Sequence, residues 1–341
     1  MSDPVRRDRL VRQQLVDPRF AEPAALVEWM GAVQCQDYAG GLWSIGRRLR
    51  RATEASVERA IEARSIVRTW PMRGTLHFVP AADARWMVRL LAPRVLARSA
   101  GRRRELEIDE AALRKARSVL GRALRGGGRL TRRAAYDALA RGGIAPEGQR
   151  GIHVLGHLAQ EGVLCFGPRE GRQPTFVLMD EWIPASREPA REEALATLAT
   201  RYFRSHGPAT AADFAWWSGL TLRDARAAID AAGVSHPSEP RATRAAGPPA
   251  AAFLQAWDEY LVAYRDRSAA DGGSAGRPAA VGAPLVVVDG VVRGAWRRES
   301  SASQVRLRLD VPATLTGPER RAVRAEALGY AAFLGLDPVV V

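Results

Sequence analysis

Two glutamines near the start of the chain, Gln34 and Gln36, carry side chains that could take part in chemistry. An amide accepts and donates hydrogen bonds, so a pair of amides can orient a water molecule beside a reacting bond. Residues two apart in an extended segment point to the same side, about 6–7 Å apart along the chain. We therefore predict that the preceding helix ends near Val33 and that the motif is extended. The same spacing also occurs between ordinary polar residues.

Asp37 is the competing candidate, because a carboxylate is a better general base and a better stabiliser of positive charge than an amide. It would point away from the two glutamines if the strand continued, so we rank it second. Tyr38 is a further candidate for contact with a ligand. Cys35, which has no evident base beside it, is expected to be a small buried thiol.

A second group of polar residues, Arg73, Thr75 and His77, alternates along an extended segment expected over residues 67–79. Residues at this spacing share one face of a strand, from which they could approach a base or phosphate groups. A structural role is an equally open alternative. Lys115 is the only lysine and lies outside every motif, which argues against an enzyme that forms a Schiff base.

Cysteine and histidine are too sparse to indicate a metal site. The chain has two cysteines, and no Cys-x-x-Cys pattern accompanies them. His153 and His157 are four residues apart, but no carboxylate motif joins them, so a structural pair is the better interpretation. We expect neither a metal nor another cofactor. The alternating residues 305–311 indicate a half-buried strand in a mainly β C-terminal segment, which a helix expected over 320–334 closes.

The 341 residues carry a formal net charge of +14, which favours an anionic polymer as partner. Residues 94–133 hold thirteen basic and four acidic side chains, an excess of nine positive charges. A GC-rich genome can raise arginine content, but it does not explain this clustering. The positions predicted to contact DNA are Arg102, Arg103, Arg104, Arg132, Arg133, Arg297 and Arg298.

No apolar run is long enough to span a membrane, and the N-terminus has no secretory signal. We therefore expect a cytoplasmic, nucleoid-associated protein, acting as a monomer. Three helices over residues 111–161 followed by two strands at 163–166 and 175–179 give the order of a winged helix, with its wing at residues 169–172. A helix, a glycine-containing turn and a helix over residues 210–231 form a helix-turn-helix pattern.

Several strings then occur together and in order. They are residues 34–38 and 41–43, residues 68–77, residues 257–260 with 264–267, and residues 288–290 with 294–298. This set resembles the AlkZ/YcaQ group of winged-helix DNA glycosylases over nearly the whole chain. The Gln-x-Gln form at Gln34 and Gln36 matches the AlkZ-like branch, whereas YcaQ-like members have Gln-x-Asp. Ala295 departs from the threonine expected before Trp296.

The resemblance implies an α+β fold of three tandem winged-helix domains, at residues 1–105, 106–186 and 187–240, followed by a small C-terminal β-barrel at 250–341. It implies catalysis by Gln34 and Gln36 and monofunctional excision of bulky or N7-alkylated purines from double-stranded DNA. Some members of the group also unhook interstrand cross-links or give self-resistance to a toxin, so the resemblance makes these activities further expectations. The residues predicted to support a structural scaffold are Asp258, Glu259, Tyr264 and Arg267.

Two alternatives share the basic patch and the helix-turn-helix signals. A winged-helix transcription regulator would have no use for paired glutamines and would usually dimerise on a palindrome. A non-catalytic protein that binds damaged DNA is the second alternative. An assay for base excision separates both alternatives from a glycosylase.

Overall fold

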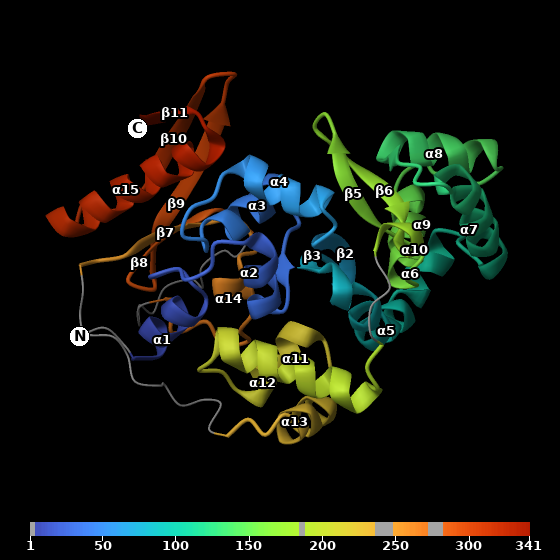
Figure 1. Cartoon of the computed structure of the whole chain (residues 1–341), viewed down its shortest axis with the longest axis horizontal. Helices are drawn as coiled ribbons and strands as arrows, with labels where there is room; N and C mark the ends of the chain where they lie inside the picture. Colours follow the sequence, from blue (N-terminus) through green and yellow to red (C-terminus); the bar gives the residue numbers. More distant parts are fainter. Residues whose placement is uncertain (1–3, 184–187, 236–247, 272–281) are drawn as a thin grey trace. The chain divides into compact units, whose positions relative to one another are not determined.

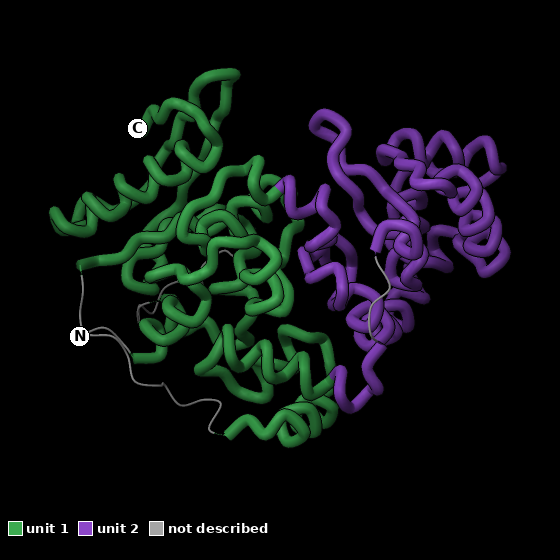
Figure 2. Tube along the Cα trace, in the orientation of Figure 1, with its two compact units in different colours: residues 1–57, 195–341 green, residues 58–194 purple. Residues whose placement is uncertain are grey.

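The computed structural model of the chain describes residues 4–183, 188–235, 248–271 and 282–341. They form two compact units: unit 1 contains residues 1–57 and 195–341, and unit 2 contains residues 58–194 (Figure 2). The domain boundary expected at residue 186 and most of the linker expected at residues 236–250 lie outside the described residues. Among the helices that are described, none is both long and apolar enough to cross a membrane.

Unit 2 is built on antiparallel strands that lie in the order β3–β2–β5–β6–β4 (Figure 1). The strands are β2 (Ile66–Met72), β3 (Thr75–Pro80), β4 (Leu130–Thr131), β5 (Leu164–Glu170) and β6 (Gln173–Leu178). The helices are α5 (Ala81–Arg98), α6 (Ala100–Glu105), α7 (Glu110–Leu124), α8 (Arg132–Arg141), α9 (Arg150–Gln160) and α10 (Met179–Trp182).

The chain from α7 to β6 runs helix, strand, helix, helix, hairpin, which is the order expected for the second winged helix. Thr131 is the N-cap of α8 and accepts a hydrogen bond from the backbone of Ala134 at 3.3 Å. The apolar faces of α7, α8 and α9 pack with Phe166 and Phe176 of the hairpin in one buried cluster. Burial of these faces on the sheet supplies the main stabilisation of the unit.

Both hairpins of unit 2 have tighter turns than the sequence suggested. The segment expected to extend over residues 67–79 is broken by Arg73 and Gly74, whose φ angles are 56° and 80°. Two successive positive φ values make the short turn that suits the twist of a hairpin. The strands β5 and β6 likewise extend to a two-residue turn that contains Gly171, so half of the wing loop expected at residues 169–172 is strand.

Unit 1 contains the N-terminal elements and all elements after α11. The N-terminal elements are α1 (Pro4–Arg12), α2 (Pro23–Met30), β1 (Val33–Gln34), α3 (Tyr38–Gly46) and the start of α4 (Glu54–Glu62). The next helices are α11 (Arg191–His206), whose first residues belong to unit 2, α12 (Ala211–Ser218), α13 (Leu222–Ala231) and α14 (Glu259–Val262). The remaining elements are β7 (Ala251–Leu254), β8 (Leu285–Val288), β9 (Val291–Ser300), β10 (Gln304–Asp310), α15 (Gly317–Leu334) and β11 (Asp337–Val340).

The helix-turn-helix pattern expected over residues 210–231 is present in α12 and α13. Thr210 caps α12 in a capping box with Asp213, Gly219 ends that helix at a φ of 76°, and Thr221 caps α13. Residues 188–235 contain helices and turns, and no β-strand is described in this range. The expected pattern of two capped helices is therefore confirmed, without a described wing.

The C-terminal strands form a curled five-stranded sheet in the order β11–β10–β9–β8–β7. The turn of Asp289 and Gly290 between β8 and β9 has φ angles of 48° and 81°, as the Asp-Gly pair predicted. In the described residues the sheet is curled into a half-barrel with β7 and β11 at its edges, which agrees in part with the small β-barrel expected. The helix α15 packs against both edge strands (Figure 1), which covers one face of the open sheet.

Candidate active site

The first glutamine of the motif, Gln34, is the last residue of β1, and 3% of its surface is exposed. Its backbone N–H donates to Oε1 of Glu259 at 2.7 Å. Its carbonyl oxygen accepts from Nε2 of Gln255 at 3.1 Å. Both partners are buried; Gln255 directly follows β7, and Glu259 is the first residue of α14. The main chain of Gln34 is thus held on both sides by side chains of unit 1.

The second glutamine, Gln36, lies in a bend before α3 and is exposed. The helix α2 ends at Met30, close to the expected end near Val33. The expected extended conformation is observed only for the start of the motif, because β1 ends at Gln34 and the chain turns into a new helix. Cys35, between the glutamines, is fully buried, as expected.

Asp37 is the N-cap of α3, and its Oδ2 accepts from the backbone N–H of Gly40 at 2.6 Å. The strand ends at Gln34 and does not reach Asp37, so the geometry on which we ranked Asp37 second is not the one observed. The carboxylate nevertheless has a structural partner at the helix N-terminus, where a negative charge is favourable. Tyr38, the first residue of α3, is half-buried.

The helix α3 fixes the motif against the C-terminal part of unit 1. The indole N–H of Trp43 donates to the carbonyl of Phe253 at 2.7 Å. A side chain at Gly46 would place its Cβ 2.2 Å from the ring of Phe333, so this position requires glycine. Because α3 follows the motif directly, these contacts determine where the bend containing Gln36 lies.

Glu259 is fully buried, and its second carboxylate oxygen also has partners. The indole N–H of Trp217 donates to Oε2 of Glu259 at 2.9 Å, and Nε2 of His206 lies 3.4 Å from the same atom. The His206 ring stacks on Tyr202, with ring centroids 5.0 Å apart. A buried carboxylate is stable only when such partners replace water.

A second buried carboxylate, Asp258, forms an ion pair with Arg48, at 2.6 and 3.0 Å. Both side chains are almost completely buried. Asp258 also caps α14, and Arg48 contacts Gln13, which hydrogen-bonds to Tyr264. Burial raises the pKa of Tyr264 to about 12, so its hydroxyl stays protonated. The scaffold predicted from Asp258, Glu259 and Tyr264 is present.

The fourth residue of that scaffold, Arg267, is not part of an ion pair with Asp258. Its Nε donates to the carbonyl of Leu261 at 3.2 Å, and its guanidinium lies 5.8 Å from the ring of exposed Trp216. The scaffold therefore uses Arg48, which the sequence did not single out.

The polar residues of unit 2 do not share one strand face as expected, because Arg73 lies in the β2–β3 turn. Its Nη2 is 3.3 Å from Nε2 of His77, whose Nδ1 is 3.0 Å from the carbonyl of Thr75. A carbonyl only accepts, so Nδ1 of His77 carries the proton and Nε2 accepts from Arg73. His77 is fully buried and Thr75 half-buried. These contacts support the structural alternative for His77.

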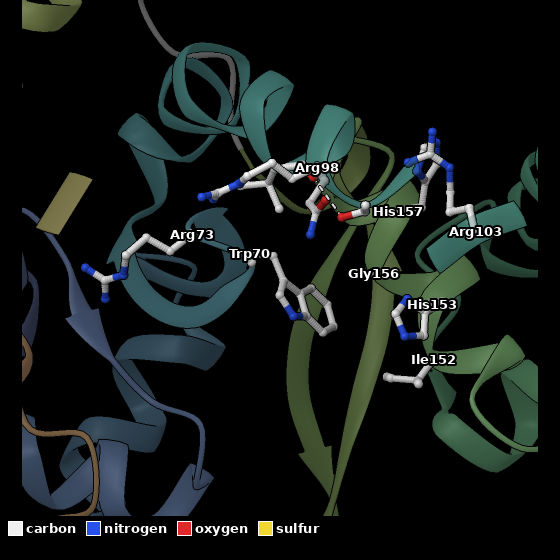
Figure 3. A pocket seen from close by; sticks show the side chains of 12 residues that line it. Trp70, Arg73, Arg98, Arg103, Ile152, His153, Gly156 and His157 are labelled. Carbon is white, nitrogen blue, oxygen red and sulfur yellow. Dashed lines mark hydrogen bonds between the residues drawn. The ribbon is translucent and has the colours of Figure 1, made fainter. Parts of the chain in front are cut away.

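Unit 2 contains a hollow of about 440 Å³ between the β2–β3 turn, α5, α6 and α9. Its twelve lining residues include three arginines and two histidines but no acidic side chain. Figure 3 shows Trp70 and His153 on opposite sides, while Arg73 points away from Trp70. Burial is the main cause that lowers the pKa of His153 and of His157, so both are neutral at pH 7. The positive charge of the hollow therefore comes from its three arginines.

The arginines predicted to contact DNA differ in their surroundings. In α6, Arg102 pairs with Glu105 at 2.6 Å, Arg103 donates to the carbonyl of Leu96 at 2.8 Å, and Arg104 is exposed. Arg132 and Arg133 begin α8 and are exposed. In β9, Arg297 is exposed, whereas Arg298 donates to the hydroxyl of Tyr330. Arg104, Arg132, Arg133 and Arg297 thus offer the most accessible charges of the set.

Comparison with known proteins finds related DNA glycosylases. A family model described as "DNA glycosylase AlkZ-like" matches residues 27–333. An interstrand DNA cross-link repair glycosylase of Streptomyces sahachiroi is 28% identical over 331 residues, covering 84% of this chain and 85% of the relative. The solved structure of Streptomyces sahachiroi DNA glycosylase AlkZ matches with a TM-score of 0.72 and 25% identity, covering 100% of both chains.

The fold and the matched residues define the protein as an enzyme of DNA repair. The chain belongs to the AlkZ-like DNA glycosylase family, because the family model spans most of its length, including the Gln34 motif. It is accordingly a DNA glycosylase, a hydrolase that cleaves N-glycosyl bonds in DNA. The alternative of a transcription regulator is wrong.

Sequence reasoning missed Gln255, His206 and Trp217, which lie around Gln34 and Glu259. The partners of Gln34 are 221 and 225 residues away along the chain. No spacing rule connects positions so far apart. Glu259 itself was within a recognised string, but only a structural role was expected for it.

Proposed function

We propose that Gln34 and Gln36 are the catalytic residues of a monofunctional glycosylase that removes bulky or N7-alkylated purines from double-stranded DNA. The observation that carries this proposal is their setting: Gln36 is exposed beside a main chain that Glu259 and Gln255 hold in place. A fixed backbone keeps the two neighbouring amides in constant positions, which suits the orientation of a single water molecule by both.

The proposed reaction needs no general acid. Alkylation at N7 puts a positive charge on the base, so the base leaves as a neutral molecule and needs no proton. As the glycosidic bond breaks, its electron pair goes to the purine, and positive charge develops on the sugar. The amide oxygens stabilise this charge and orient a water that attacks C1′. The product is an abasic sugar, and the proton of the water passes to solvent.

A Schiff-base mechanism is not part of the proposal. The only lysine, Lys115, lies on α7 in unit 2, far along the chain from the glutamine motif. We expect borohydride to trap no covalent complex between the enzyme and damaged DNA. A trapped complex that is lost in Lys115→Ala would show that the enzyme is also a lyase.

Removal of cross-linked purines belongs to the same proposal, since the relative from Streptomyces sahachiroi is named an interstrand DNA cross-link repair glycosylase. Each half of an N7-linked cross-link is itself a cationic purine, so one chemistry serves both lesions. The proposal also includes three winged-helix domains with the boundaries expected from the sequence. We further propose that the protein is a monomer, that it is cytoplasmic and associated with the nucleoid, and that it provides self-resistance to a toxin.

The proposal is tested with three duplexes that carry one N7-methylguanine, one N3-methyladenine or one N7-linked interstrand cross-link. Alkali-sensitive abasic sites should appear with the cationic N7 adduct, and the strands of the cross-linked duplex should migrate separately under denaturing conditions. An undamaged duplex of the same sequence is the control. Binding of all the duplexes without any abasic site would support the damage-binding alternative and contradict the proposed catalysis.

A further inference from the structure

The main chain of Gln34 is held by two side chains from one short segment. The N–H of Gln34 donates to Oε1 of Glu259 at 2.7 Å, and its carbonyl accepts from Gln255 at 3.1 Å. The bond to Glu259 is the shorter of the two, and Glu259 has no exposed surface. Glu259 is therefore the principal restraint on this end of the motif.

Glu259 has little freedom to turn. Its other oxygen accepts from the indole of Trp217 at 2.9 Å and lies 3.4 Å from Nε2 of His206. The residue has no exposed surface, so water does not compete for either oxygen. Helices α11 and α12, which carry His206 and Trp217, thus fix the direction in which the carboxylate faces Gln34.

The backbone of the residues that precede Glu259 is fixed as well. Its neighbour Asp258 is ion-paired with fully buried Arg48 at 2.6 Å and accepts from the N–H of Tyr260 at 3.0 Å. Trp257, before Asp258, has a φ of 67° and is 39% exposed. A tryptophan keeps this conformation only where the surrounding contacts determine it. The anchored turn presents Gln255 and Glu259 to the same residue.

We infer that Glu259 is a positioning residue of the glycosylase reaction: it fixes the backbone at Gln34 and thereby the place of the Gln36 amide two residues later. The inference rests on the proposed role of the glutamines. Glu259 does not touch the substrate, because it is fully buried. A shift of about 1 Å in a positioned group can lower a rate by about 10²-fold. Loss of the hydrogen bond from Gln34 to Glu259 should therefore affect the chemical step.

The test measures single-turnover excision of N7-methylguanine and, separately, the Kd for the same duplex. Glu259→Ala should lower the excision rate about 10-fold or more, while the Kd changes less than about twofold. Glu259→Gln should lose less, because its amide oxygen can still accept from Gln34. If Glu259→Ala does not fold, Glu259→Gln carries the test, with an expected loss of about threefold to tenfold.

Asp8→Asn is the matched control. Asp8 is also a largely buried carboxylate of unit 1, and its Oδ1 accepts from Nε of Arg12 within the same helix, α1, at 2.8 Å. Its substitution should lower the Tm but leave the excision rate unchanged. An equal loss of rate in Asp8→Asn would show that reduced stability, rather than positioning, explains the Glu259 variants.

A double-mutant cycle separates this inference from the proposed function. If Glu259 acts through Gln34, Glu259→Gln should cost little further rate in a Gln34→Ala background. A full multiplicative loss in that background would overturn the inference, as would a wild-type rate in folded Glu259→Gln. A wild-type rate in Gln34→Ala would instead overturn the proposed catalytic role of Gln34, on which the inference rests.

Discussion

Asp37 and Gln36 are neighbours in sequence with different surroundings. The Asp37 carboxylate accepts from Gly40 in the first turn of α3, whereas the Gln36 amide is exposed beside it. An N-cap replaces a missing intrahelical partner, so this carboxylate has a role in stability whether or not it takes part in chemistry. The two roles respond differently to substitution, which makes Asp37 testable.

Asp37→Asn should keep both the cap and the activity, because asparagine is as good an N-cap as aspartate. Asp37→Ala should lower the free energy of unfolding by about 0.5–2 kcal/mol, the usual cost of a lost cap. Chemical denaturation measures the free energy of unfolding of both variants, and abasic-site formation measures their activity. Abolished excision in a folded Asp37→Asn enzyme would identify Asp37 as the active-site carboxylate.

At the scale of elements, α9 connects the sheet of unit 2 with the hollow near Trp70. Two of its glycines have opposite surroundings. A Cβ at Gly156 would meet nothing within 4 Å, whereas a Cβ at Gly151 would lie 2.6 Å from the Tyr136 ring and 2.8 Å from the carbonyl of Pro146. The helix therefore needs glycine at its start, where the chain packs closely, but not at its centre.

Gly156→Ala should raise the free energy of unfolding by about 0.5–1 kcal/mol, because alanine loses less backbone entropy in a helix. Gly151→Ala, in the same helix, should lower it by about 1–3 kcal/mol, since backbone atoms must move. Urea denaturation of both variants gives the comparison. A stabilised Gly151→Ala would contradict the close packing of α9 against Tyr136.

The sequence predicted those elements whose signals are local. The Asp289–Gly290 turn and the threonine caps of α12 and α13 were predicted correctly, because each depends on residues within a few positions. The turn at Arg73 was missed, since arginine rarely begins a turn with two positive φ angles and the flanking residues suit a strand.

The candidate site was predicted in part. The resemblance selected Gln34 and Gln36, but nothing local indicated that Glu259 would bind the Gln34 backbone from 225 residues away. Equally, His77 was expected on an open strand face, yet the tertiary fold buries it beside Thr75 and Arg73. Contacts between distant segments depend on packing, which residue spacing does not encode.

At the scale of the whole molecule, the net charge of +14 should dominate its attraction to DNA. Contacts with phosphate groups release bound counterions, so affinity falls steeply as salt rises. With six or more such contacts, the affinity for undamaged duplex should fall about 10³-fold between 50 and 200 mM salt. A flat response in a fluorescence-anisotropy titration would contradict this prediction.

Arg132 and Arg133 allow a sharper test of the same prediction. Both are exposed at the start of α8, and no ion pair within the described chain involves either. Arg132→Gln with Arg133→Gln should lower the slope of log affinity against log salt by up to about two. Arg117→Gln is the control, because Arg117 is already paired with Glu161 at 2.6 Å. An equal change of this slope in Arg117→Gln would contradict a specific role of α8 in DNA binding.

The central claim is that the enzyme binds DNA through its arginines and cleaves the glycosidic bond with its two glutamines. Single-turnover excision of N7-methylguanine by wild type, Gln34→Ala and Gln36→Ala, each with its Kd for the duplex, tests it most directly. Each variant should excise about 10–100-fold more slowly with a nearly unchanged Kd. The double variant should lose less than the product of both effects, because both amides would hold the same water. Full activity in both single variants would contradict the account.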